Sequence, residues 1–505
     1  MQLIVSAGLI AAIVLWGLIS PLTLARFFGE ALVSITHNFG WLYLWLVLGL
    51  ICLAFFLALS HFGDLKLGDE DDEPEFSIGA WFSMLFAAGM GIGLVFWGVA
   101  EPLSHYASAP PGVVSHTPEA ANAAMRYAFF HWGLHPWAIY GVVGLSIAFF
   151  QFRRNAPALV SSATEALPWK IVQKMSPAFN VLATIAGAFG VATSLGMGAT
   201  QINSGLSAVF GLPVNNFSQA GIIVVTTILF LVSAVSGVGR GIKWLSTGNL
   251  ILAAVLAMAV LILGPTVAII NTFTTTLGGY ISEFVRMSLN MTPFRESSWI
   301  GDWTIFYWAW WISWSPFVGL FIARVSRGRT IRQFILGTVL APTLVGFVWF
   351  SIFGGAALYM DIFQSVPLTE AVSTDVSTAL FVLFEALPYG SIMSLVATVL
   401  ILIFFVTSGD SATLVLAMMT SGGNPEPKNS LKIIWGVLIS GIALSLLFAG
   451  GLKAVQTATI VFALPFSIVL VLMAISVTRA IHQDWHAEQL REKELRRKVR
   501  ALIKN

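Results

Sequence analysis

The chain has 505 residues, of which 57% are hydrophobic and only 10% charged, and its formal net charge is +2. Its mean hydropathy of +0.85 excludes a soluble protein of this length and indicates a polytopic membrane protein. The single cysteine, Cys52, excludes an intramolecular disulfide and any cysteine-based metal site.

Twelve apolar stretches are each long enough for a membrane-spanning helix, which needs about 20 residues. They begin near residues 3, 40, 77, 128, 178, 219, 247, 303, 333, 389, 431 and 457. The first has no basic segment before it and no obvious cleavage site, so we expect a span and not a cleaved signal. With the N-terminus inside, 21 of the 26 Lys and Arg residues fall on the cytoplasmic side, which predicts that both termini are cytoplasmic.

The third predicted span contains Gly89, Gly91 and Gly93 at alternate positions. Each glycine weakens a helix by about 1 kcal/mol and lets the backbone approach another group closely. Glycines that only pack two helices together recur along one face, and this spacing does not, so we expect an unwound segment. Glu101, near the outer end of the same span, is expected to anchor that helix end.

The fourth predicted span carries Trp132, Trp137 and Tyr140. Trp137 and Tyr140 lie three residues apart on one helical face, with Trp132 one to two turns below them, and such rings suit the recognition of a quaternary ammonium. His131 and His135 offer metal ligation as an alternative, but no Glu completes a metalloenzyme motif.

The eighth predicted span has four tryptophans within seven residues, namely Trp308, Trp310, Trp311 and Trp314. Four indole N–H groups would lack partners in lipid, so we expect the rings to converge inside the protein, with Trp311 completing an aromatic box. An aromatic packing seam is the alternative. Because proline removes a backbone donor, we also expect this helix to be interrupted between Ser313 and Pro316.

The two predicted interruptions lie in spans 3 and 8, which are five spans apart. Each span therefore opens a five-helix unit, and an odd number of spans inverts the second unit relative to the first. Interrupted helices at matching positions of inverted repeats predict the substrate site of a transporter.

The tenth predicted span contains Thr407 and Ser408, whose hydroxyls make a compact oxygen site for a hard cation. Ordinary bonding of the hydroxyls to their own helix is the alternative. Asp410 follows within or near the bilayer, and Arg324 ends the eighth span on the same side. We expect these two to form a gate pair or a structural helix-end pair.

From the second span to the twelfth, these motifs resemble the betaine/carnitine/choline transporter (BCCT) family. The resemblance rests on Gly89-Met90-Gly91-Ile92-Gly93, His131-Trp132, His135-Pro136-Trp137, the run from Trp308 to Phe317, and Arg-Val-Ser-Arg-Gly-Arg at 324–329. It implies an all-α fold with a leucine-transporter-like core of two inverted five-helix repeats, usually as a homotrimer. The sequence most resembles sodium-coupled glycine betaine carriers of bacterial osmoprotection, which implies the bacterial inner membrane.

The resemblance also assigns residues to sites. The implied ammonium box is Trp132, Trp137, Tyr140 and Trp311, with Trp310 and Trp314 beside it. The implied carboxylate site is the backbone of Gly89, Gly91 and Gly93, with Ser194 of the fifth span close by. The implied Na+ site comprises carbonyls of Ala87, Met90 and Phe404 and hydroxyls of Thr407 and Ser408. A second family Na+ site would include Phe317, but Gly187 and Val191 stand where hydroxyls are expected, which leaves the second ion and the stoichiometry open.

The chain thus divides into five predicted regions. They are two peripheral spans (1–63), a first repeat (76–271), an outer connecting segment (272–300), a second repeat (301–479) and a charged cytoplasmic helix (480–505). The basic end of that helix either contacts anionic lipid or is simply solvated.

We predict a secondary transporter that imports a quaternary-ammonium zwitterion, glycine betaine being the favoured substrate, with Na+. Choline carriers of the family tend to place Asp in the glycine-rich segment, where this chain has Gly93. Coupling to H+, or transport of ectoine, carnitine or choline, are the alternatives within the family. An intramembrane enzyme is the alternative from another class, and only the pair of His131 and His135 supports it.

Overall fold

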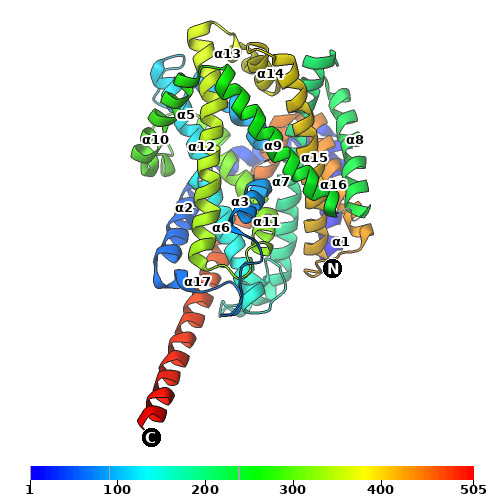
Figure 1. Cartoon of the computed structure of the whole chain (residues 1–505). Helices are drawn as coiled ribbons and strands as arrows, with labels where there is room; N and C mark the ends of the chain where they lie inside the picture. Colours follow the sequence, from blue (N-terminus) through cyan, green and yellow to red (C-terminus); the bar gives the residue numbers. More distant parts are fainter. Residues whose placement is uncertain (1, 90, 237–238, 505) are drawn as a thin grey trace.

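The computed structural model describes residues 2–89, 91–236 and 239–504, and the regular secondary structure of these residues is helical. Ten helices in this part are long and apolar enough to cross a membrane, and one pair of helices bent by 108° brings the count to eleven. The chain is therefore an all-helical, multi-span membrane protein, as its composition predicts (Figure 1).

Apart from α10, the long helices cover predicted apolar stretches. They are α1 (Gln2–Ile19), α2 (Pro21–Leu59), α7 (Lys170–Phe210), α8 (Asn216–Ser236), α9 (Gly239–Leu263), α10 (Thr266–Ser288), α11 (Phe306–Arg324), α12 (Ile331–Gln364), α15 (Gly390–Thr420), α16 (Asn429–Gly450) and α17 (Leu452–Lys504). Shorter helices are α3 (Ile78–Gly89), α4 (Ile92–Ala107), α5 (Pro118–Trp132), α6 (Leu134–Ala148), α13 (Leu368–Thr374) and α14 (Ala379–Glu385). A π-helical turn, η4 (Gly301–Ile305), leads into α11.

The third predicted span is interrupted in its glycine-rich segment, as the sequence predicts. α3 ends at Gly89, α4 begins at Ile92, and Gly91 is non-helical with φ −136° and ψ −133°. Met90 lies outside the described residues. The two pieces have 12 and 16 residues, each fewer than the roughly 20 that a crossing needs. For this reason neither piece counts among the ten long apolar helices.

A second interruption, which the sequence did not reveal to us, divides the fourth span between α5 and α6. Gly133 lies at the break and has no room for a side chain. A Cβ atom there would be 2.5 Å from the carbonyl oxygen of Phe129 and 2.9 Å from the ring of Phe347. Because the helix breaks here, Trp132 does not share one continuous helical face with the rings of α6.

The eighth span, in contrast, is continuous, and the predicted interruption between Ser313 and Pro316 is wrong. α11 runs through Pro316 without a break. Proline cannot donate to the carbonyl of Ile312, one turn earlier. The hydroxyl of Ser315 donates to that carbonyl at 2.7 Å instead. The side chain thus replaces the bond that the backbone loses, and the helix continues.

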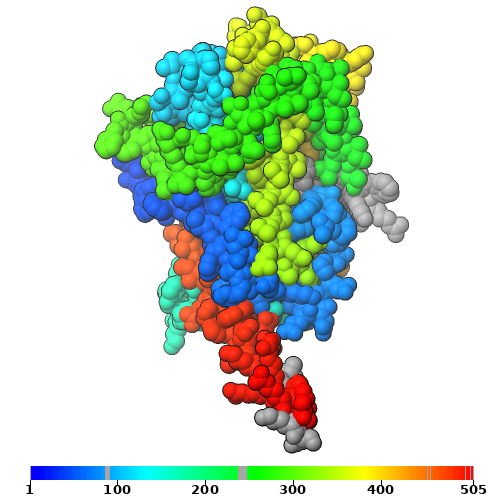
Figure 2. Space-filling model, turned by 60° about the vertical axis from the view of Figure 1, so that its left-hand side comes forward, coloured from blue at the N-terminus to red at the C-terminus, as the bar shows by residue number. Residues whose placement is uncertain are grey.

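α9 and α10 form the bent pair. α10 packs on α5 and α12, and Figure 2 shows this green segment lying across the upper half of one face. Its outward side is apolar, since Val267, Ile270, Ile281 and Val285 are all more than half exposed. α10 begins before the predicted connecting segment 272–300 and fills much of it.

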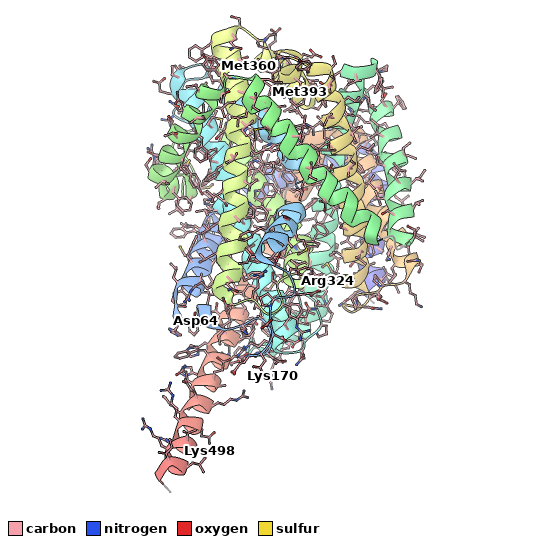
Figure 3. All side chains as sticks on the ribbon, in the orientation of Figure 1. Asp64, Lys170, Arg324, Met360, Met393 and Lys498 are labelled. Atoms are coloured by element: carbon pink, nitrogen blue, oxygen red, sulfur yellow. The ribbon has the colours of Figure 1, made fainter. Side chains whose placement is uncertain are left out.

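The charged C-terminal segment is helical, as predicted, and is the end of α17 rather than a separate element. It projects from one end of the bundle (Figure 1). Figure 3 places Asp64, Lys170 and Lys498 toward that end, and Met360 and Met393 at the opposite end. Asp64 and Lys170 therefore lie on the side of the bundle from which α17 projects.

Two arginines after α6 hold the projecting helix. Arg154 pairs with Asp484 at 2.6 Å, and Arg153 pairs with Asp484 at 3.1 Å and with Glu488. Each of these side chains is partly buried, so the contacts are better shielded from water than ordinary surface pairs.

We predict that Ser315→Ala lowers the thermal stability of the solubilised protein, because it leaves the buried carbonyl of Ile312 without a donor, at a cost of about 1–3 kcal/mol. Ser146→Ala is the matched control. Ser146 is equally buried and donates to the carbonyl of Val142 at 2.7 Å, in a helix where no proline removes the backbone donor. Thermal unfolding in detergent measures both variants, and equal shifts would contradict this explanation of the continuous helix.

Candidate functional site

A small cavity lies inside the protein where five helices meet. It is lined by Gly91, Ile92, Gly93 and Leu94 at the start of α4, Trp132 at the end of α5, Ser194 in α7, Trp310, Trp311 and Trp314 in α11, and Ser408 in α15. Its volume is about 30 Å³. The interruption between α3 and α4 and the one between α5 and α6 both border this cavity.

Three tryptophans from two helices form one wall of the cavity. Trp132 meets Trp311 edge to face with ring centroids 4.8 Å apart, and Trp310 stacks on Trp311 at 4.5 Å. All three rings are buried. The tryptophans of the fourth and eighth spans therefore converge in the interior, as expected, and their role in binding stays a prediction.

The other two rings of the predicted box do not line the cavity. Tyr140 contacts Trp311 edge-on at 6.2 Å, and Trp137 contacts Tyr140 at 5.5 Å. Tyr140 therefore reaches the wall only through its contact with Trp311, and Trp137 only through Tyr140.

The glycines at the start of α4 allow a close approach of backbone and rings. A Cβ atom on Gly93 would lie 2.8 Å from the ring of Trp310 and 3.0 Å from that of Trp132. A Cβ atom on Gly91 would face Ser408 of α15 at 3.8 Å. Gly93 therefore borders the tryptophan wall and Gly91 the hydroxyl side, while Gly89 ends α3 before the break.

Glu101 is completely buried at the centre of a hydrogen-bond network. One carboxylate oxygen bonds His131 Nδ1 at 2.7 Å and His105 Nε2 at 3.1 Å. The other accepts from the indole of Trp132 at 2.7 Å and from the hydroxyl of Tyr307 at 2.5 Å. Glu101 therefore joins α4, α5 and α11 inside the bundle, and the expectation that it anchors a helix end is wrong.

The same network reaches the second tryptophan of the wall. The indole of Trp311 donates to the backbone carbonyl of His131 at 3.0 Å, and His131 Nε2 bonds Thr304 at 3.0 Å. Trp132 and Trp311 are thus both held by their N–H groups, one on Glu101 and one on the residue that Glu101 positions. Sequence reasoning missed Tyr307 and this role of Glu101, although an acid in an apolar span is by default functional or paired.

The predicted alternative of a metal held by His131 and His135 is not what the structure shows. His135 bonds Ser288 at 2.9 Å and stacks on Trp308 at 4.8 Å, away from His131. Glu101, His105 and His131 do bring three donor atoms within 4.8 Å of one another. Their direct hydrogen bonds account for this cluster, because ligands of one ion would be held apart by that ion.

The predicted ion site is described in part. Phe404 is buried in α15, and Ser408 lines the cavity opposite Gly91. The hydroxyl of Thr407 donates to the carbonyl of Ile403 at 2.9 Å, which leaves its lone pairs available to a cation. Met90 lies outside the described residues, and Ala87 belongs to the last turn of α3.

The residues implied for a second Na+ lie where α7 packs on α11. Phe317 is buried and meets Trp314 edge-on at 5.5 Å. A Cβ atom on Gly187 would come within 4.0 Å of the carbonyl oxygen of Ser313, and Val191 is buried beside it. Small and apolar residues at these positions of α7 thus serve close helix packing.

The predicted pair of Arg324 and Asp410 is not formed in this conformation. Asp410 in α15 accepts a hydrogen bond from Ser233 of α8 at 2.5 Å. Arg324 ends α11, and within the described residues it takes part in no ion pair with Asp410.

These features define a class of protein. Interrupted helices that meet around an enclosed aromatic cavity in a multi-span bundle are the architecture of secondary transporters, in which irregular backbone inside the membrane serves a binding site.

Comparison with known proteins assigns the family. The model of the betaine/carnitine/choline family transporters, BCCT, matches residues 2–486. The chain is 50% identical over 478 residues to the glycine betaine transporter OpuD of Bacillus subtilis, covering 94% of this chain and 93% of that one. It is 45% identical to the ectoine/hydroxyectoine transporter of Virgibacillus pantothenticus, with 93% and 95% covered, and 42% identical to glycine betaine transporter 1 of Vibrio parahaemolyticus, with 94% and 92% covered. The chain belongs to the BCCT family and is a secondary transporter, not an enzyme, which confirms the resemblance.

We predict that Glu101→Gln weakens substrate binding by about tenfold while the protein still assembles, because an amide cannot accept from all four donors and an unpaired buried donor costs about 1–3 kcal/mol. Glu385→Gln, at the exposed end of α14, is the control. Equilibrium binding of radiolabelled betaine to protein with a normal size-exclusion profile measures the effect. Wild-type affinity in Glu101→Gln would show that the network does not position the wall.

Proposed function

We propose that this transporter imports a small quaternary-ammonium zwitterion, glycine betaine before others, by symport with Na+. BCCT transporters are ion-coupled. The observation that carries the proposal is the cavity between the tryptophan wall of α5 and α11 and the first turn of α4. Relatives that are glycine betaine transporters support this substrate, and the ectoine/hydroxyectoine transporter among them makes ectoine the second candidate.

The tryptophan wall suits the cationic end of such a substrate. A quaternary ammonium has no N–H to donate, so hydrogen-bonding side chains cannot compensate for the water it loses. Ring faces can, by up to about 2 kcal/mol for each well-placed ring out of water. Trp132, Trp310 and Trp311 already border the cavity, and Trp137 and Tyr140 join them when the wall opens.

The start of α4 suits the carboxylate end. The first N–H groups of a helix have no acceptor within the helix, and the helix dipole favours an anion there. Because the helix is interrupted at Gly91, the N-terminal end of α4 lies in the interior, and Gly93 and Leu94 of its first turn line the cavity. Ser194 adds a hydroxyl from α7.

The other side of the break suits the ion. α3 ends at Gly89, so the carbonyls of its last turn, Ala87 among them, have no donor within the helix. Together with the proposed Met90 and Phe404 carbonyls and the hydroxyls of Thr407 and Ser408, they offer the oxygen ligands that a hard cation prefers. An ion that joins α3 to α15 orders the segment that binds the carboxylate. The two affinities must then be coupled reciprocally.

The conformation described here is closed around the site. A water molecule needs about 10–15 Å³ of such space, so a cavity of about 30 Å³ must enlarge before a betaine enters. A larger cavity of about 370 Å³ lies on the other side of Trp310 and is lined by Trp97, Trp303 and Phe306 among others. Phe306 stacks on Trp310 at 5.7 Å. We infer that this ring pair separates an outer vestibule from the substrate site.

The proposed architecture has twelve spans, with α3 and α4 forming the third, and two inverted repeats at 76–271 and 301–479. We propose that both termini are cytoplasmic in a bacterial inner membrane, that the chain is a homotrimer, and that the basic end of α17 contacts anionic lipid. The excess of Lys and Arg in the loops predicted to be cytoplasmic supports this orientation.

We predict that Trp311→Leu lowers betaine affinity at least about tenfold, since it keeps bulk but removes a ring face worth up to about 2 kcal/mol. Trp311→Phe separates the two roles of this residue, because it keeps a π face and loses only the bond to the His131 carbonyl. Binding by a panel of betaine, ectoine, carnitine and choline, with and without Na+, is the measurement. Leu and Phe variants of equal affinity would contradict the cation–π role.

We predict that Thr407→Ala with Ser408→Ala raises the Na+ concentration needed for half-maximal betaine uptake, because two oxygen ligands are lost and no carboxylate in the motif replaces them. Betaine affinity at fixed Na+ should weaken, and added Na+ should partly restore uptake. Uptake into proteoliposomes against Na+ concentration is the measurement, with Ser411→Ala in the same helix as the control. Superimposable curves would place the ion elsewhere.

A further inference from the structure

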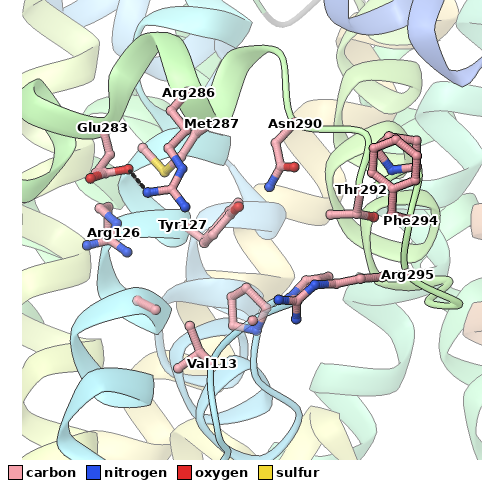
Figure 4. A pocket seen from close by; sticks show the side chains of 15 residues that line it. Val113, Arg126, Tyr127, Glu283, Arg286, Met287, Asn290, Thr292, Phe294 and Arg295 are labelled. Carbon is pink, nitrogen blue, oxygen red and sulfur yellow. Dashed lines mark hydrogen bonds and ion pairs between the residues drawn. The ribbon is translucent and has the colours of Figure 1, made fainter.

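A second cavity, of about 370 Å³, lies at the end of the bundle opposite the projecting α17, between α5 and α10 (Figure 4). Its walls are the loop 110–113, the side chains of Ala123, Arg126 and Tyr127 on α5, Glu283, Arg286 and Met287 on α10, and the segment 290–295. It shares no lining residue with the substrate cavity or with the vestibule.

The cavity carries an excess of positive charge. Three arginines, Arg126, Arg286 and Arg295, reach it from three different segments, and Figure 4 shows their guanidinium groups around one space. Glu283 is the one acid in the lining, and it pairs with Arg286 at 3.2 Å. Within the described residues no ion pair involves Arg126 or Arg295, so two positive charges stay uncompensated.

Arg126 is partly buried, and the exposed side chains of Arg286 and Arg295 line the same cavity. Arg126 Nε is buried without a hydrogen-bond partner, although the site is polar. Gly112, with φ +99°, brings the backbone under Arg295, and a Cβ atom there would lie 3.3 Å from its Nη1. Tyr127 is buried at the base of the cavity and Asn290 stands at its rim, so neutral hydrogen-bonding groups accompany the charges.

We propose that this cavity binds a phosphate group. Guanidinium forks match the oxygens of phosphate in pairs, and an anion with one or two charges balances the two free arginines. Arg126, whose buried Nε has no hydrogen-bond partner, thus gains an anionic partner on the side of its guanidinium that faces the cavity.

Two sources can supply this group, free phosphate and the headgroup of an anionic phospholipid. The surroundings favour the lipid. Ile281 and Val285 on α10 are 67% and 62% exposed, and Phe294 at the edge of the cavity is 98% exposed. Such apolar surface beside a cationic cavity suits acyl chains below a phosphate.

The site is placed to influence transport. Arg126 lies six residues before Trp132 on α5, which is about 9 Å along the helix at 1.5 Å per residue. A ligand that joins α5 to α10 and to the loop 110–113 restrains the helix whose end carries one tryptophan of the wall.

The test uses the purified full-length transporter without substrate. Native mass spectrometry counts the molecules of phosphatidylglycerol retained, with phosphatidylcholine as the zwitterionic comparison, and thermal unfolding follows a titration with inorganic phosphate against chloride at constant ionic strength. We expect phosphatidylglycerol to be retained and to stabilise the protein. In Arg126→Gln with Arg295→Gln the affinity should fall by at least about tenfold, since two charge-assisted contacts are lost. Arg26→Gln, an exposed arginine on α2, should change nothing.

The outcomes separate the sources. Retention of phosphatidylglycerol without a response to inorganic phosphate identifies a lipid site, and a response to both identifies a site for the phosphate group itself. The absence of both responses in the wild type, or equal responses in wild type and double variant, overturns the proposal. If the double variant fails to assemble, Arg295→Lys replaces it, because it keeps the charge and loses the fork, and unchanged affinity there also overturns it. Because betaine is absent throughout, the result is independent of the proposed function.

Discussion

The structure depends on one buried carboxylate. Glu101 has no contact with water, and a charge in that position is tolerated only when its oxygens are fully hydrogen-bonded. Four donors meet this requirement, and they come from α4, α5 and α11. Since one of them is the indole of Trp132, the cost of burying the charge is offset by the same contacts that fix the tryptophan wall. The hydrogen bonds that stabilise the buried carboxylate are therefore also the ones that fix the position of Trp132 in the wall.

Interruptions in helices place backbone groups where side chains alone could not act. The break at Gly91 brings the positive end of α4 into the interior beside the carbonyl end of α3, so that groups for an anion and for a cation lie close together. The break at Gly133 brings Trp132 to face Trp311 rather than the rings of its own continuing chain. α11 is the unbroken partner of both, and its tryptophans stay in register because Ser315 compensates for Pro316. The two breaks thus place backbone groups at the cavity, and the continuous helix α11 places three rings there.

The two cavities differ in the chemistry of their linings. The small cavity is aromatic and has Trp310, which stacks on Phe306, in its lining, while the cavity between α5 and α10 is cationic and shares no lining residue with it. α5 contributes to both, with Arg126 in the one and Trp132 in the other. A single helix thus connects the arginine cavity with the proposed substrate site, which is the kind of physical link that lets binding at one affect the other.

The sequence by itself determined the membrane class, most helix positions, the unwound segment around Gly91 and the aromatic character of the site. These follow from local properties, namely apolar length, glycine spacing and the chemistry of indole. Its motifs also pointed to the family.

Only the tertiary structure decided the rest. Pro316 looked like a break because the hydroxyl that replaces its hydrogen bond belongs to a neighbour whose rotamer no pattern reveals. Gly133 looked unremarkable because a side chain there is excluded by the local backbone geometry at Phe129 and by Phe347, which is more than two hundred residues away. Trp137 and Tyr140 share a face of α6, but they do not line the cavity that Trp132 lines. The reason is that the helix is interrupted at Gly133, between Trp132 and these two rings. Glu101 looked like a helix anchor because three of its four donors, His131, Trp132 and Tyr307, are brought to it by packing from other helices, and long-range contacts leave no mark on local sequence.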